Sequence, residues 1–250
     1  MFVAVLRRSY HSVERNSRRN SRTTPGRALV AAAVDDRLGA AVALLFVQGW
    51  RVSEVLGLAW GHVDLDAGLA TVRRACVYAD GHGMMLGPPK TAGAEGQHLL
   101  APIVVQLLRR RKENQAAEIA AGGAAWKRQR FEGRDIELIF TTPAGGLVLR
   151  QAVTKAVATA ALAAGLHPTG LGAHGGRSTA ITALYGEEGI DLADVARHVG
   201  HSNPATTATY VRHLGRRPRA TAEAAGRLLD PTVARTASPM PSELGDGRDE

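Results

Sequence analysis

Aromatic residues and cysteine are both scarce in this chain of 250 residues. Phe, Trp and Tyr together make up 4% of it, whereas apolar residues make up 45%, so its core must be built mainly from Ala, Val and Leu. That composition favours helices over a sandwich of β-sheets. Cys76 is the single cysteine, which excludes an internal disulfide and any metal site with several thiolate ligands.

Long apolar runs and a secretory leader are also missing. No apolar run reaches the roughly 18 residues that would span a bilayer. The short apolar start of the chain is interrupted by Arg7 and Arg8, which is too early for a secretory signal. We therefore expect a cytoplasmic protein with no membrane partner.

Positive charge is in excess and unevenly distributed. The formal net charge is +8 and the isoelectric point is about 10.3. Residues 1–30 contain seven arginines and one glutamate, whereas residues 237–250 contain four acids and one arginine. A polyanion such as DNA suits this balance, although charge alone also serves solubility.

Hydrophobic periodicity predicts a fold of the α+β class that is mainly α. The pattern is helical over most of the chain from Arg27 onward, including a helix capped by Ser53 and another after Pro102. Between residues 62 and 102 the period is two, and a D-A-G turn at 66–68 separates short runs rich in Val and Leu. Together with the segment GQHLLAP, these runs predict a small antiparallel sheet of three strands, with a glycine-rich excursion over residues 81–96.

A set of basic and hydroxyl side chains is left over once the core is assigned. Each has an ordinary explanation by itself: Arg51 precedes Glu54 by one helical turn, as in many helix-start ion pairs, and Tyr210 suits a half-buried aromatic. Their combination is what chemistry on a phosphodiester without a metal requires. The candidate catalytic residues are Arg51, Lys90, His174, Arg177, His201 and Tyr210.

The chemistry assigns a role to each member of this set. Two guanidinium forks, from Arg51 and Arg177, can hold the non-bridging oxygens of a phosphoryl group under attack. A tyrosine hydroxyl with an ordinary pKa of about 10 needs help to lose its proton, and His174 can supply it. Lys90 can protonate the departing 5′ oxygen, and His201 can donate a further hydrogen bond to the phosphate.

The order of the motifs resembles that of the tyrosine recombinases, the phage integrase family. The segments that carry the resemblance lie within residues 26–214 and are QGWRVSEVLGLAWGHVDLD, PPKTAG, IFTTPAGG, HGGRSTAITALYG and VGHSNPATTATY. All six candidate residues match a catalytic position of that family. The resemblance implies that Tyr210 forms a 3′-phosphotyrosyl bond to double-stranded DNA, with neither metal nor ATP as cofactor. It also implies a tetramer on DNA and accessory DNA-bending proteins.

Two departures from the family pattern lead to expectations of their own. Gly175 and Gly176 stand before the second arginine, and two glycines there loosen a helix by roughly 1 kcal/mol each, so we expect Arg177 to be less firmly placed. Residues 1–25 resemble a basic linker and the remnant of a missing core-binding domain. Residues 26–229 are then the catalytic domain, and 230–250 a disordered tail.

Other functions fit parts of the same pattern. A type IB topoisomerase uses a similar Arg, Lys, His and Tyr set but works as a monomer. A non-catalytic DNA-binding remnant of an integrase would explain the short front segment and the Gly175–Gly176 pair. A metal site of His174, His201 and His213 is less well supported, because no H-x-x-x-H pair or carboxylate cluster accompanies these residues.

Overall fold

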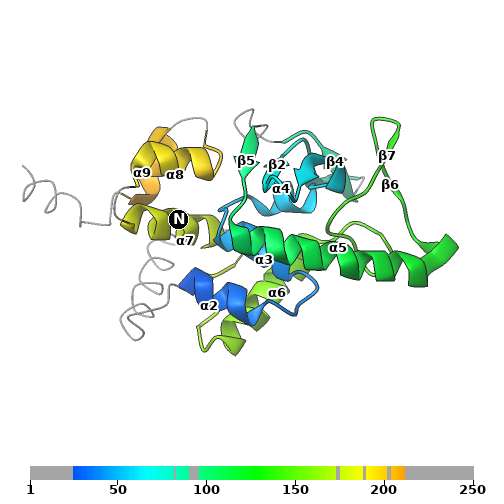
Figure 1. Ribbon diagram of the computed structural model, residues 1–250, viewed down its shortest axis with the longest axis horizontal. Helices are drawn as coiled ribbons and strands as arrows, with labels where there is room; N and C mark the ends of the chain where they lie inside the picture. Colours follow the sequence, from blue (N-terminus) through cyan, green and yellow to red (C-terminus); the bar gives the residue numbers. More distant parts are fainter. Residues whose placement is uncertain are drawn as a thin grey trace, which may run out of the picture. The chain divides into compact units, whose positions relative to one another are not determined.

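The computed structural model describes residues 25–81, 83–89, 96–172, 175–187, 190–201 and 204–211. Helices dominate these residues, and the strands form small antiparallel sheets (Figure 1). The predicted class, α+β and mainly α, is confirmed. In the part of the chain so described, no helix has both the length and the apolar character needed to cross a membrane.

The core is built around α3 (Gly39–Phe46), in which every residue is buried. A helix that is apolar all round must be covered on all sides. Neighbours of α3 are α2 (Pro25–Ala32), α4 (Val52–Leu56), α5 (Pro102–Gly122), α6 (Arg150–Ala163) and α7 (Gly175–Gly186). Ala, Val and Leu fill most of this core, as the scarcity of aromatic residues predicts.

The predicted three-stranded sheet is confirmed. Its strands are β1 (Val63–Asp64), β2 (Leu69–Thr71) and β5 (Gln97–Leu99), in the order β1-β2-β5. Ala70 of β2 lies opposite Val63 on one side and His98 on the other. A short 3₁₀ helix, Trp60–His62, leads from α4 into this sheet.

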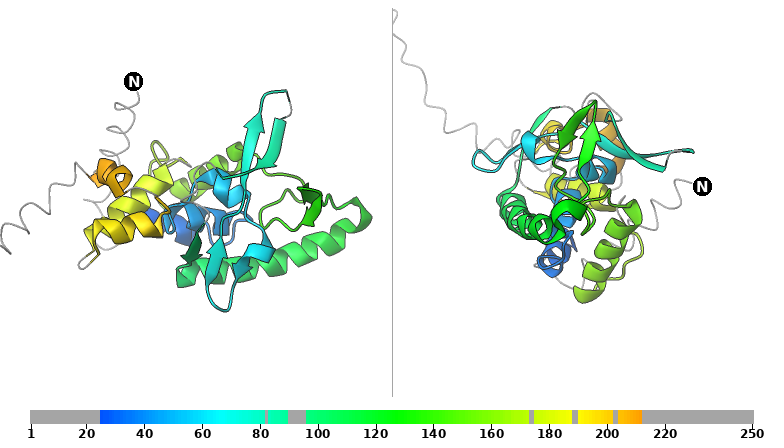
Figure 2. Two further views of the ribbon diagram at one scale, coloured as in Figure 1. Left: turned by 90° about the horizontal axis from the view of Figure 1, so that it is seen from above. Right: turned by 90° about the vertical axis from the view of Figure 1, so that its right-hand side faces the viewer.

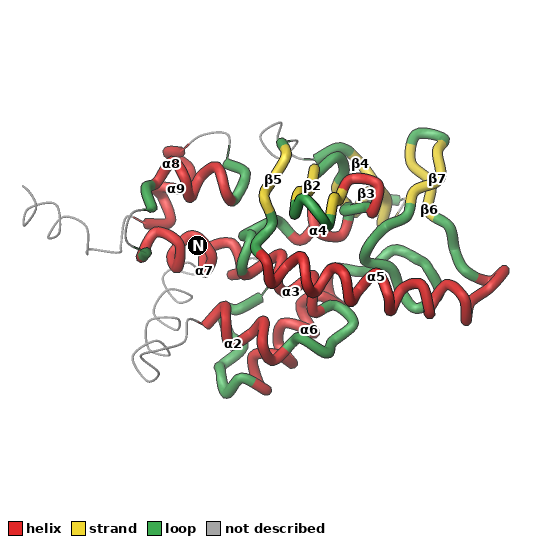
Figure 3. The backbone as a smooth tube through the Cα atoms, viewed as in Figure 1, coloured by secondary structure: helices red, strands yellow, loops and turns green. Residues whose placement is uncertain are grey.

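Two hairpins were not resolved by the sequence pattern. β3 (Ala75–Ala79) pairs with β4 (Gly83–Gly87) between β2 and β5, so the glycine-rich stretch that we expected to be an excursion contains a strand. β6 (Gln129–Phe131) and β7 (Arg134–Ile136) follow α5 and the 3₁₀ turn Gly123–Ala125 (Figure 3). Glu132 and Gly133, between these strands, both have positive φ, which is the geometry of a tight hairpin turn.

The last described elements are α8 (Leu192–His198) and α9 (Pro204–Val211). Asp191 caps α8 by accepting a hydrogen bond from the backbone N–H of Asp194 at 2.7 Å. Pro204 occupies the first position of α9, where a proline is well tolerated. Residues 1–24 and 212–250 lie outside the described residues, so the proposed linker and the proposed disordered tail stay predictions.

Candidate active site

Arg51 lies in a tight corner between α3 and α4. Gly49, which has φ of +68°, turns the chain after α3, and a side chain there would place its Cβ 2.8 Å from Cγ1 of Val199. Glycine is therefore needed both for the backbone conformation and for the close approach of α8. Arg51 itself is the N-cap of α4, which corrects the expectation that Ser53 caps this helix.

A buried carboxylate fixes Arg51 in this corner. The backbone N–H of Arg51 donates to Oε2 of Glu54 at 2.9 Å, and its Nη1 donates to Oε1 at 2.7 Å. Glu54 is 3% exposed, whereas the Arg51 side chain is 30% exposed. The ion pair thus holds the base of a guanidinium whose outer part reaches solvent, where it can meet a ligand.

Two glycines let α7 approach its neighbours closely and so place Arg177. A Cβ on Gly175 would lie 2.2 Å from the carbonyl oxygen of Gly170, and one on Gly176 would lie 2.8 Å from that of Leu45 in α3. Arg177, the next residue, is 6% exposed. The expectation that Arg177 is loosely placed is therefore wrong. The two glycines permit tight packing at the start of α7, where Arg177 lies.

Arg177 joins two segments that are distant in sequence. Its Nη1 donates to the carbonyl oxygen of Gly49 at 3.1 Å, and its Nε donates to Nε2 of His201 at 3.0 Å. His201 also contacts Oγ1 of Thr207 through Nδ1, at 2.6 Å. Because Arg177 can only donate, Nε2 of His201 accepts, so a neutral ring carries its proton on Nδ1 and donates to Thr207.

The surroundings of His201 favour its neutral form. Burial, followed by the charges of Arg177 and Arg51, lowers the pKa of His201 from 6.5 to about 4. Each cause disfavours a second positive charge beside two guanidinium groups. Arg177 contacts His201 directly, and the charge of Arg51 acts on the pKa of the ring in the same direction.

The end of α8 directs His201 into this environment. Gly200 has φ of +70°. Its backbone N–H donates to the carbonyl oxygen of Arg197 at 3.2 Å, and the backbone N–H of His201 donates to the carbonyl oxygen of Ala196 at 2.8 Å. The second bond, which spans six residues, is typical of a glycine-terminated helix end. Gly200 is therefore the glycine at which α8 ends.

The structure thus brings together three of the six sequence-predicted residues: Arg51, Arg177 and His201. Lys90 and His174 lie outside the described residues, Lys90 just after β4 and His174 just before α7. Tyr210 lies in α9, one helical turn after Thr207, and its side chain is outside the description.

Sequence reasoning missed one member of the site, Thr207. This residue is completely buried and belongs to the T-x-x-Y spacing that ends the last family motif. The spacing was visible in the sequence, but nothing in it showed that the threonine contacts a histidine on the other side of a turn.

Comparison with models of protein families identifies the family of this chain. The model of the phage integrase family matches residues 27–217, which is most of the chain. The chain is a member of the phage integrase family, the tyrosine recombinases. Comparison with curated proteins gives no match.

Solved structures of recombinases have the same fold. One is the Tn1549 transposon integrase with the substitution Y379F, in complex with transposon right end DNA. The TM-score is 0.62 and the sequence identity is 20%, and the match covers 84% of this chain and 63% of that one. The same integrase in complex with circular intermediate DNA gives 0.60 and 19%, covering 73% and 58%. XerA recombinase gives 0.57 and 20%, covering 81% and 63%. This chain therefore spans about three fifths of the length of those structures.

Proposed function

We propose that this chain is a site-specific DNA recombinase that cleaves and rejoins double-stranded DNA through a phosphotyrosyl intermediate at Tyr210. The observation that carries the proposal is the convergence of Arg51, Arg177 and His201 from three separate segments, next to the helix that contains Tyr210. Membership of the phage integrase family and the DNA complexes of the structurally similar Tn1549 integrase support it.

The proposed reaction begins with attack by the Tyr210 hydroxyl on a backbone phosphorus. The bond from the tyrosine oxygen to phosphorus forms while the bond from phosphorus to the 5′ oxygen breaks. The tyrosine proton passes to His174, and Lys90 gives a proton to the departing 5′ oxygen. A free 5′ hydroxyl then attacks the phosphotyrosine of a partner strand and releases Tyr210, so the bond energy is conserved without ATP.

Arg51 and Arg177 would stabilise the charge that develops on the non-bridging oxygens. Their anchors, Glu54 and the carbonyl of Gly49, fix both guanidinium groups before substrate arrives, and such preorganisation is a large contribution to catalysis. A phosphate between the two arginines would offset the charges that lower the pKa of His201. Its Nε2 could then gain a proton and donate to the phosphate, instead of accepting from Arg177.

The decisive experiment is capture of the covalent adduct on suicide DNA. A pool of duplexes with randomised cores, each nicked so that the cleaved end diffuses away, avoids the need to know the attachment site. The wild-type chain should give a protein–DNA adduct that resists denaturant, Tyr210→Phe should give none, and Tyr185→Phe is the matched control. No adduct with the wild type would contradict the proposal and leave a non-catalytic DNA-binding role.

A second substrate separates the proposed acid from the other residues. In a 5′-bridging phosphorothiolate the leaving group is a thiolate, which departs without being protonated because its pKa is low. This substrate should restore cleavage to Lys90→Ala but not to Arg177→Gln. Equal rescue of both variants, or of neither, would contradict the role given to Lys90.

Assembly into a tetramer on DNA and help from DNA-bending proteins belong to the same proposal. Light scattering of the DNA complex tests whether the tetramer forms.

A further inference from the structure

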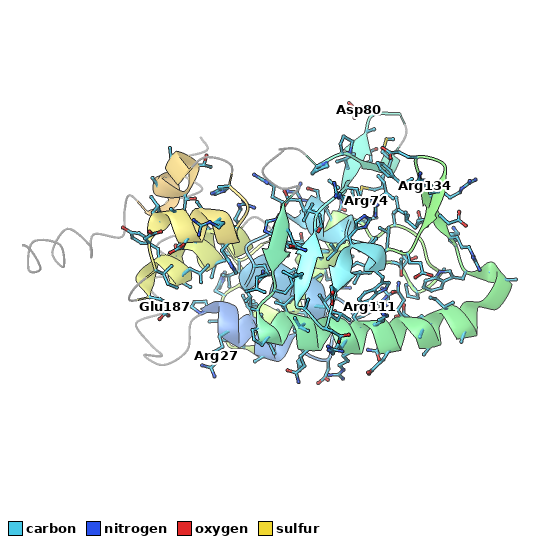
Figure 4. The ribbon with its side chains drawn as sticks, turned by 45° about the horizontal axis from the view of Figure 1, so that its top comes forward. Arg27, Arg74, Asp80, Arg111, Arg134 and Glu187 are labelled. Carbon is cyan, nitrogen blue, oxygen red and sulfur yellow. The ribbon has the colours of Figure 1, made fainter. Side chains whose placement is uncertain are left out.

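A second cluster, made of basic side chains and one aromatic ring, lies away from the candidate active site, between the sheet and the β6–β7 hairpin. We call it the Arg74 cluster; its members are His62, Arg73, Arg74, Phe131 and Arg134. His62 ends the 3₁₀ helix before β1, the two arginines join β2 to β3, and Phe131 and Arg134 face each other across the hairpin. Figure 4 shows Arg74 and Arg134 beside each other above α5.

Arg74 is an unusual arginine in its surroundings. It is 7% exposed, its guanidinium carbon lies 5.4 Å from the centre of the Phe131 ring, and its Nε has no hydrogen-bond partner among the described residues. Within the same residues no carboxylate forms an ion pair with it, and Glu132 acts on it only through its charge. A buried cation without a paired anion is costly, so a residue of this kind indicates a ligand of opposite charge.

His62 adds a second unsatisfied nitrogen to the cluster. Its Nδ1 is buried without a hydrogen-bond partner in the described part of the chain. Burial, then the charges of Arg74 and Arg73, lower the pKa of this histidine. An anion bound beside these groups would offset the repulsion between Arg73, Arg74 and a protonated His62.

Backbone packing holds the cluster at a defined spacing from Arg51. Gly57, at the C-terminal end of α4, lies so close to the carbonyl of Arg74 that a Cβ on it would be 2.5 Å from that oxygen. Arg51 stands at the other end of α4, about 9 Å away at about 1.5 Å per residue.

The cluster also lies on the appropriate side of the domain. The views in Figures 1 and 2 agree in placing the β6–β7 hairpin and α9 on the same side of α5. A duplex held at Arg51, Arg177 and α9 would therefore extend toward this hairpin. Within the hairpin Arg130 pairs with Asp135 at 3.2 Å, and the charges that remain are those of Glu132 and Arg134.

We propose that the Arg74 cluster binds a DNA backbone phosphate next to the one at the candidate active site. Arg74 supplies a positive charge that forms no ion pair among the described residues, Phe131 packs against its guanidinium group, and Arg134 adds an outer positive charge. This proposal rests on the proposed function for the identity of the ligand, but it concerns binding and not cleavage. Contact with a phosphate positions the duplex without reading its sequence.

The salt dependence of DNA binding tests the cluster. With the full chain and a short mixed-sequence duplex, Arg74→Gln should reduce the slope of log affinity against log salt concentration by about 0.9, the loss expected for one phosphate contact. Arg134→Gln, at an exposed position that does not endanger folding, should also reduce the slope. Arg150→Gln is the matched control, since it removes an exposed positive charge from α6, below α3 in Figure 1.

A duplex series with one neutral methylphosphonate per molecule locates the contact. A methylphosphonate at one position of the duplex should weaken binding by the wild type and leave the affinity of Arg74→Gln unchanged. Unchanged slopes in Arg74→Gln and Arg134→Gln, with circular dichroism showing folded proteins, would overturn the proposal, as would no binding of any duplex by the wild type. Reduced slopes in a chain that forms no covalent adduct would support the cluster while contradicting the proposed function.

Discussion

At the scale of single residues, the hydroxyl of Thr207 determines which nitrogen of His201 carries the proton. Thr207 is completely buried, and its Oγ1 lies 2.6 Å from Nδ1 of that ring. With Nδ1–H directed at Thr207, Nε2 faces Arg177 and the position where we propose the phosphate binds. Thr207 would thus act as a positioning residue through His201, and it also ties α9 to the site one turn before Tyr210.

We predict that Thr207→Val slows formation of the covalent adduct about ten- to hundredfold, because a buried hydrogen bond of about 1–3 kcal/mol is lost and each 1.4 kcal/mol is about tenfold in rate. Thr207→Ser keeps the hydroxyl and should restore most of the rate. Thr206→Val, at an exposed neighbouring position, is the matched control. If serine restored no more than valine, packing and not the hydrogen bond would be the role of Thr207.

The residues of the site were predictable to different degrees. Arg51, Arg177 and His201 follow from motifs that keep residue type and spacing, so their convergence could be predicted. The contact between His201 and Thr207 could not, because it depends on the turn made by Gly200 and on side-chain geometry across it. The N-cap of α4 was assigned to Ser53 by residue preference, whereas Arg51 takes this position and gains two hydrogen bonds to Glu54.

At the scale of elements, the contact between α7 and α3 positions the second arginine. Gly176 allows the helix to approach the carbonyl of Leu45, and Arg177 follows directly. Helix propensity suggested that these glycines weaken the helix start, but propensity describes an isolated helix and takes no account of a neighbouring backbone. The β6–β7 hairpin escaped prediction for a different reason: its strands are short and mostly polar, and none of their residues is buried.

We predict that Gly176→Ala lowers the free energy of unfolding by about 1–3 kcal/mol, as expected for overpacking, despite the better helix propensity of alanine. Its Cβ would lie 2.8 Å from the Leu45 carbonyl oxygen, which is too close for a real contact. The matched control is Gly186→Ala in the same helix, where a Cβ meets nothing within 4 Å and stability should stay equal or rise slightly. Thermal denaturation of both variants measures the difference, and equal stability would contradict the packing argument.

At the scale of the whole domain, one carboxylate joins three parts of the chain that are far apart in sequence. Glu118 of α5 accepts two hydrogen bonds from Arg111 of the same helix, at 2.7 and 2.9 Å, and two from Arg37 between α2 and α3, at 2.7 and 2.8 Å. Arg111 continues to the carbonyl of Ile139 at 3.0 Å, and Arg37 also donates to the carbonyl of Thr141. The strand-like segment after β7 is thus tied to α5 and to the entrance of the central helix α3.

This carboxylate should make the stability of the domain depend on pH in the acid range. Burial alone would raise the pKa of Glu118, but hydrogen bonds and charges from Arg111 and Arg37 outweigh it and hold the pKa at about 2, below its ordinary value of 4.5. Because the folded protein holds this proton less tightly than the unfolded chain, the stabilisation is complete above pH 4.5 and is lost progressively as the pH falls toward 2.

We predict that Glu118→Gln lowers the free energy of unfolding at neutral pH by about 3 kcal/mol, because it leaves buried Arg111 without its anion. The difference from the wild type should shrink below pH 4.5, and urea unfolding at a series of pH values measures it. Glu113→Gln, exposed on the same helix, is the control; a Glu118→Gln deficit that stayed constant down to pH 2 would show that charge is not what this residue contributes.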